Sequence, residues 1–125
     1  MTFDWRLYVD LADELTTYHR TSSFQDAYYR TAISRAYYGV YHLAKKILID
    51  KGCVLPPKSQ HQFVRDTLLA STVRTERRIG THLSRLWKDR VDADYKEVAS
   101  IDKSRATTTY MMAKNTLELI NSLSL

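Results

Sequence analysis

Cysteine, glycine and proline are all scarce in this chain of 125 residues. The single cysteine, Cys53, has no second cysteine to pair with and no partner at zinc-ligand spacing, so neither a disulfide framework nor a structural zinc site is supported. Three glycines and the adjacent pair Pro56 and Pro57 are too few for the many tight turns of an all-β protein. The composition therefore favours helices and a reducing, cytoplasmic location.

Long apolar runs are also missing. No stretch approaches the roughly 20 apolar residues that a membrane span requires, and the first residues lack the pattern of a signal peptide. Apolar residues still make up 44% of the chain and charged residues 26%, which is typical of a folded globular protein. We expect a single domain over residues 1–125 that does not associate with membranes.

Apolar side chains recur at spacings of three and four residues along five segments, which predicts helices over residues 3–19, 22–51, 59–70, 73–95 and 101–123. Ser22 with Gln25 and Ser59 with Gln62 resemble capping boxes, and Gly52 is expected to end the second helix. Each helix has one apolar face, and that of the first comprises Trp5, Tyr8, Leu11, Ala12, Leu15 and Tyr18. The expected fold is an all-α, antiparallel, up-and-down bundle of four or five helices.

The second expected helix has the most informative pattern. At 100° per residue, its core face comprises Ile33, Tyr37, Val40, Tyr41, Ala44 and Leu48, and the opposite face comprises Arg35, Gly39, His42 and Lys46. Arg35 and His42 are two helical turns apart and project in nearly the same direction, so they can contact one ligand. Gly39 lies between them as a bare patch that a second helix or a phosphate backbone could approach closely.

Arg35 and His42 suit one kind of chemistry. A histidine can transfer a proton near neutral pH and an arginine can stabilise negative charge on a phosphate, as RNA cleavage without a metal requires. We therefore take Arg35 and His42 as candidate catalytic residues and expect no cofactor and no metal ligand. A solvated stripe of arginine, histidine and lysine would show the same periodicity, and the spacing does not distinguish the two.

Positive charge is concentrated between Arg65 and Arg90, where seven basic residues stand against three acidic ones. Such an excess suits RNA or a nucleotide, because neutralising phosphates releases condensed counterions, although a solvated face would look the same. One face of the helix expected over residues 73–95 comprises Arg78, His82, Arg85 and Asp89. It is either a phosphate-binding surface or a set of exposed charges that includes an ion pair between residues one turn apart.

Two other predictions concern individual side chains. Arg90 and Asp94 point to the apolar side of their helix, so they are expected to form a partly buried ion pair. His61 and His19 lie near helix ends, where a cap or a surface position is expected.

Two motifs resemble the HEPN superfamily. Residues 32–44, Ala-Ile-Ser-Arg-Ala-Tyr-Tyr-Gly-Val-Tyr-His-Leu-Ala, resemble its signature helix, in which Ser-Arg-x-Tyr-Tyr is followed by an aromatic residue and a histidine. Residues 90–95, Arg-Val-Asp-Ala-Asp-Tyr, resemble the later Arg-x-x-Ala-Asp-Tyr element. The resemblance implies a helical bundle, a homodimer, and a partner that is often a small nucleotidyltransferase acting as an antitoxin. It also implies metal-independent ribonuclease action through an Arg-x4-6-His motif, with the site completed across the dimer.

Arg35 and His42 match this spacing, and so do Arg77 and His82, although the latter two diverge by about 140° on a regular helix. In the members that cleave RNA the motif lies on a later helix, where this chain has Tyr95 in place of a histidine. The residues expected to bind RNA or a nucleotide are Tyr38, Lys45, Lys46, Arg78, His82, Arg85, Arg90, Asp94 and Tyr95. The alternatives are a non-catalytic subunit that binds nucleotide or RNA beside a nucleotidyltransferase, and a purely structural interaction module.

Overall fold

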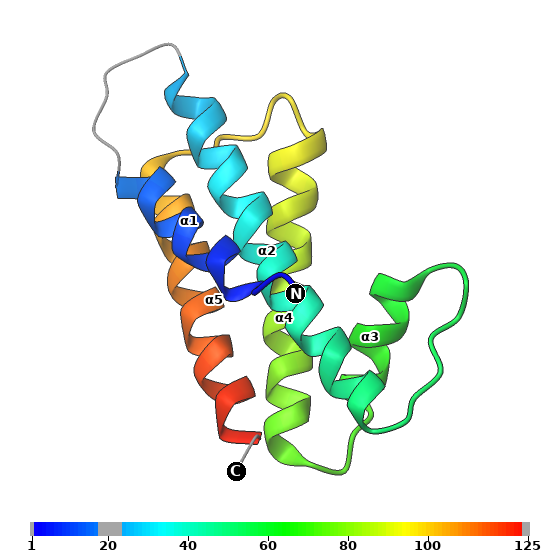
Figure 1. The fold of residues 1–125 in the computed structure, drawn as a ribbon. Helices are drawn as coiled ribbons and strands as arrows, with labels where there is room; N and C mark the ends of the chain where they lie inside the picture. Colours follow the sequence, from blue (N-terminus) through cyan, green and yellow to red (C-terminus); the bar gives the residue numbers. More distant parts are fainter. Residues whose placement is uncertain (1, 18–23, 124–125) are drawn as a thin grey trace.

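The computed structural model describes residues 2–17 and 24–123, which form five helices and no strand. The helices are α1 (Arg6–Thr17), α2 (Gln25–Asp50), α3 (Gln60–Leu69), α4 (Arg74–Tyr95) and α5 (Lys103–Leu123). In Figure 1, α1 and α4 run upward while α2 and α5 run downward, and the short α3 lies to one side next to α4. The expected all-α bundle is confirmed. None of these helices is long and apolar enough to cross a lipid bilayer.

The helix ends agree with the expected ones to within a few residues, and the differences have local causes. α1 begins at Arg6 instead of residue 3, because the Asp4 side chain accepts a hydrogen bond from the Arg6 backbone N–H at 3.1 Å and so caps the helix there. Gly52 ends α2 as expected, with a left-handed φ of 89° that suits glycine.

Only one of the two expected capping boxes can be compared with the structure. Ser59 does precede α3, but its φ is 58° and its side chain makes no capping hydrogen bond, so the predicted capping box is wrong. The other predicted box begins at Ser22, which lies outside the described residues, as do Tyr18 and His19.

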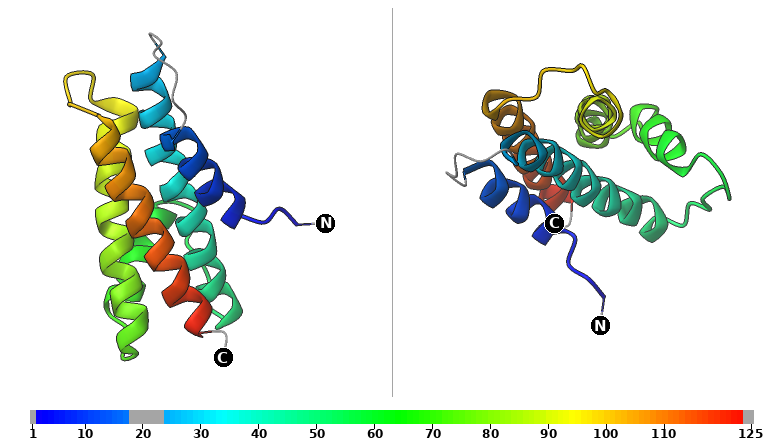
Figure 2. Two further views of the ribbon diagram at one scale, coloured as in Figure 1. Left: turned by 90° about the vertical axis from the view of Figure 1, so that its left-hand side faces the viewer. Right: turned by 90° about the horizontal axis from the view of Figure 1, so that it is seen from above.

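α2 is the central helix and packs against α1, α4 and α5. Figure 2 shows α1 lying across α2 on one side, and α4 and α3 on the other. All six residues of its expected core face are buried, and Tyr37 is completely so. Since a fully buried large apolar side chain contributes about 1.5–3 kcal/mol, this face carries much of the bundle's stability.

The buried face of α1 differs from the expected one. Its buried residues are Val9, Ala12 and Thr16, whereas Leu11, expected in the core, remains 38% exposed. Small side chains at 12 and 16 let α1 approach its neighbours closely, and the Thr16 hydroxyl donates to the Ala12 carbonyl at 2.7 Å, which satisfies it. The prediction was wrong because the aromatic residues Trp5 and Tyr8 indicated an apolar face that is rotated around the helix axis from the face that is buried.

The start of α1 accounts for Gly39. A Cβ atom at this position would lie 2.8 Å from the Trp5 carbonyl oxygen and 3.0 Å from Cγ2 of Val9, so only glycine fits. The expected close neighbour is therefore a helix of the same chain. The face opposite the core is therefore partly covered by the start of α1, because Gly39 is buried and Arg35 and His42 are half-buried.

Candidate functional site

A shallow hollow of about 390 Å³ lies where the start of α1, the middle of α2 and the end of α4 meet. It is lined by Trp5, Tyr8, Ser34, Arg35, Tyr38, His42, Arg90 and Asp94. Five of these are expected site residues, and they come from two motifs that are far apart in the sequence. The packing of α2 against α4 therefore brings the signature helix and the Arg-x-x-Ala-Asp-Tyr element to one place.

Tyr38 lies between the two arginines of the hollow. The guanidinium carbon of Arg35 is 5.2 Å from the centre of the Tyr38 ring, and that of Arg90 is 5.0 Å from it. Tyr8 lies 4.7 Å from the Arg35 carbon and Tyr95 lies 5.2 Å from the Arg90 carbon. Cations are attracted to ring faces, and this attraction uses no hydrogen-bond donor. The rings therefore position both guanidinium groups while leaving N–H donors for a ligand.

A chain of hydrogen bonds joins the same side chains. Arg90 Nε donates to Asp94 Oδ2 at 2.8 Å, which confirms the expected partly buried ion pair. The hydroxyl of Ser34 donates to the same carboxylate oxygen at 3.2 Å and accepts a bond from Arg35 Nη2 at 3.3 Å. Arg90 Nη2 also donates to the Tyr95 hydroxyl at 3.3 Å.

The charges of the hollow do not cancel. Asp94 is the one carboxylate that lines it, and Arg35 forms no ion pair with any carboxylate in the described part of the chain. The two arginines therefore leave about one positive charge uncompensated in a partly desolvated place. Such an arrangement favours an anion, and guanidinium groups suit phosphate in particular.

His42 is held against the start of α1. Its ring stacks on Trp5 with 3.6 Å between ring centres and 15° between planes. Burial lowers the pKa of His42 below its ordinary value of 6.5, and the nearby charge of Lys45 lowers it further. The imidazole is therefore neutral at pH 7 and can accept a proton.

His61 of α3 lies in this region, although the sequence did not indicate it as a site residue. Instead of a cap or a surface position, its Nδ1 forms a hydrogen bond with the Tyr37 hydroxyl and its ring stacks on Tyr41 with 3.9 Å between centres. Burial lowers the pKa of His61 to about 4, and the charges of Arg90 and Arg65 act in the same direction. Its distance from Tyr38, 6.0 Å between ring centres, places it next to the hollow.

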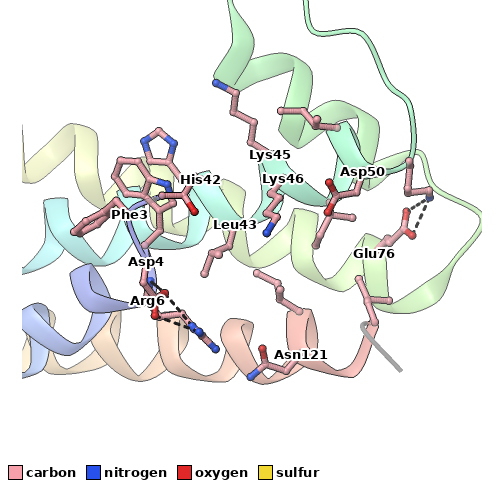
Figure 3. Close-up of a pocket in the computed structure, with 17 residues that line it drawn as sticks. Phe3, Asp4, Arg6, His42, Leu43, Lys45, Lys46, Asp50, Glu76 and Asn121 are labelled. Carbon is pink, nitrogen blue, oxygen red and sulfur yellow. Dashed lines mark hydrogen bonds and ion pairs between the residues drawn. The ribbon is translucent and has the colours of Figure 1, made fainter.

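A larger groove of about 900 Å³ adjoins the hollow and shares Trp5 and His42 with it. It runs between residues 2–6, the second half of α2 and the end of α5 (Figure 3). The expected binding residues Lys45 and Lys46 line this groove and point in different directions from α2 (Figure 3). Most other charges of the groove are paired with one another, in the ion pairs Asp4–Arg6 and Lys51–Glu76.

The remaining expected binding residues lie elsewhere on α4. Arg78 and Arg85 are exposed, and Nδ1 of His82 lies 3.0 Å from the Thr116 hydroxyl of α5. Neither cavity is lined by any of these three residues. The expected ion pair of Asp89 one turn away on α4 is wrong, because Asp89 instead accepts hydrogen bonds from two side chains of α5, Arg105 and Thr109.

The second Arg-x4-6-His match does not form a site. Arg77 is exposed and donates to the Ser71 carbonyl at 3.0 Å, away from the contact that His82 makes with α5. The divergence expected from helix geometry is thus confirmed.

A comparison with known families agrees with this geometry. The family model described as the HEPN domain matches residues 19–123, which is most of the chain. The chain belongs to the HEPN domain family. Neither a curated protein nor a solved structure shows significant similarity to it. In this HEPN protein, α1 precedes the matched segment, although Trp5 and Tyr8 from the start of the chain line the hollow.

Proposed function

We propose that this HEPN protein binds a phosphate group of RNA in the hollow and cleaves the strand there. One observation carries the proposal: Arg35, Arg90 and His42 line a single hollow in which Asp94 is the one carboxylate. The excess positive charge supports phosphate binding, and the neutral imidazole supports proton transfer.

The reaction that suits these groups is attack by a ribose 2′-hydroxyl on the adjacent phosphorus. His42 accepts the hydroxyl proton as the new oxygen–phosphorus bond forms, and Arg35 stabilises the negative charge that builds up on the phosphate oxygens. The bond from phosphorus to the 5′-oxygen then breaks, and water supplies the proton to that oxygen. The products are a 2′,3′-cyclic phosphate and a 5′-hydroxyl end, and an arginine and a histidine are sufficient for these steps.

The test is incubation of the purified protein with single-stranded RNA in the presence of EDTA, followed by gel analysis of the products. We expect cleavage, and we expect His42→Ala to slow it by at least about a hundredfold, which is the lower range for loss of a general base. His82→Ala is the matched control, because this histidine contacts α5 outside both cavities. Cleavage by His42→Ala at the rate of the unchanged protein would contradict the proposed role of the histidine.

A second candidate function is binding of RNA or a nucleotide without cleavage, beside a nucleotidyltransferase. It is favoured by the Trp5 ring, which covers one face of His42, and by Tyr95 in the place of a histidine. Calorimetry would then show that nucleotide or RNA binds, that Arg35→Gln weakens the binding, and that no product appears.

We also propose that the protein acts as a homodimer with an antitoxin partner of the nucleotidyltransferase class. The hollow is open to solvent, so a residue of a second copy could complete it. Analytical ultracentrifugation would reveal the dimer, and isolation from the native cell with a nucleotidyltransferase bound would support the partner. A monomer at micromolar concentration would contradict the shared site.

A further inference from the structure

Arg65 of α3 is a basic residue that the hollow does not use. Its guanidinium carbon lies 4.3 Å from the centre of the Trp87 ring of α4. Its Nη1 atom is buried and makes no hydrogen bond with any residue in the described part of the chain. A buried donor that lacks an acceptor is unfavourable, so a ligand that brings an acceptor oxygen to this guanidinium group would be stabilised.

Arg65 belongs to a wider group of basic side chains where α2, α3 and α4 meet. His61 precedes it by one turn on α3 and so lies on the same side of the helix. The charged and titratable groups that act on His61 are Arg90, Arg65, His42 and Lys45, and no carboxylate is among them. Because Arg90, Arg65 and Lys45 among these groups carry a positive charge at pH 7, an anion bound here would be attracted by them.

Tyr38 connects this group to the hollow. The centre of its ring lies 6.0 Å from that of His61 and 6.4 Å from that of His42. Arg90 contacts the same ring, with its guanidinium carbon 5.0 Å from the centre. A strand that places one phosphate in the hollow would therefore reach His61 within the width of one aromatic side chain, and Arg65 lies one helical turn beyond His61 on α3.

We propose that His61, Arg65 and Arg90 form a second phosphate subsite, which binds the phosphate next to the one in the hollow. The Tyr37 hydroxyl occupies Nδ1 of His61, which leaves Nε2 to face the ligand. The preferred ligand is then an RNA strand with at least two successive phosphates in place of a mononucleotide. This inference rests on the proposed function, since it assumes that the hollow holds the first phosphate.

The experiment compares two non-cleavable dinucleotides that differ by one phosphate. Both are adenylyl-adenosine with a 2′-O-methyl group on the first ribose, and one also carries a 5′-phosphate. Calorimetry at low salt should show that the 5′-phosphorylated form binds about tenfold more tightly, the effect of one hydrogen-bonded charge contact. Arg65→Gln should reduce this ratio to about one. Lys114→Gln is the matched control, because it removes an exposed positive charge from α5, which does not contact α3.

A second measurement protects the test against a variant that fails to fold. In the unchanged protein, the NMR titration of His61 should show a higher pKa when the 5′-phosphorylated dinucleotide is bound than when the form without that phosphate is bound. Equal affinities for the two dinucleotides, or an unchanged His61 pKa, would overturn the subsite while RNA cleavage in the hollow could still be observed. If neither dinucleotide binds, both the subsite and the proposed function are wrong.

Discussion

His61 should make the protein less stable in mild acid. Its pKa is about 4 in the folded protein against 6.5 for an ordinary histidine, so the unfolded chain binds more protons than the folded one between these values. The contribution of neutral His61 to the free energy of unfolding is therefore fully present above pH 6.5 and is lost as the pH drops towards 4. Between pH 7.5 and 5 the expected loss is about 1–2 kcal/mol, once solvent screening of the partly exposed ring is allowed for.

The comparison that isolates this loss is urea unfolding of the unchanged protein and of His61→Gln at both pH values. Glutamine cannot be protonated, so the variant should lose about 1–2 kcal/mol less than the unchanged protein over this range. The packing against Tyr41 that the substitution removes affects both pH values equally and cancels, as do the contributions of other histidines. If the two proteins lose the same free energy of unfolding, the account of His61 as a neutral, half-buried group is wrong.

Three further predictions concern other contacts. Trp5→Ala should raise the pKa of His42 towards 6.5 because it removes the covering ring, and NMR titration would show this; an unchanged pKa would refute the assigned cause. Gly39→Ala should displace the start of α1 and raise the same pKa, because its Cβ would lie 2.8 Å from a backbone oxygen. Glu76→Gln should cost about 1–2 kcal/mol because it removes the buried negative charge that Lys51 pairs with, measured by urea unfolding; a change below a few tenths would contradict this.

The fold was predictable mainly where the sequence pattern was long. Over the 26 residues of α2, the 3.6-residue period separates a core face clearly, and all six expected core residues are buried. In α1 the described helix has 12 residues, and a shift of its stripe by one or two positions fits the pattern almost equally well. Which of these stripes is buried depends on the shape of the groove that receives the helix.

Several residues of the candidate site could be predicted from the sequence, but the way in which they come together could not. Helix periodicity places Arg35 and His42 on one side of α2, but only tertiary packing brings Arg90 and Asp94 to the same hollow. Gly39 indicated a close approach without indicating what approaches. The position of His61 beside the hollow could not be predicted from the sequence. The periodicity of a 10-residue helix shows which residues share a face, but not which neighbour that face packs against.

The hollow is built from two parts of the chain, of which only one lies in the segment that matches the family model. The charged and proton-transferring groups lie within the segment that matches the HEPN domain, whereas the Trp5 and Tyr8 walls come from residues that precede it. Because Trp5 stacks on His42 and Tyr8 contacts the Arg35 guanidinium, substitutions at these two positions would alter both the wall of the hollow and the surroundings of Arg35 and His42. A segment outside the matched family region thus sets part of the environment of two side chains inside it.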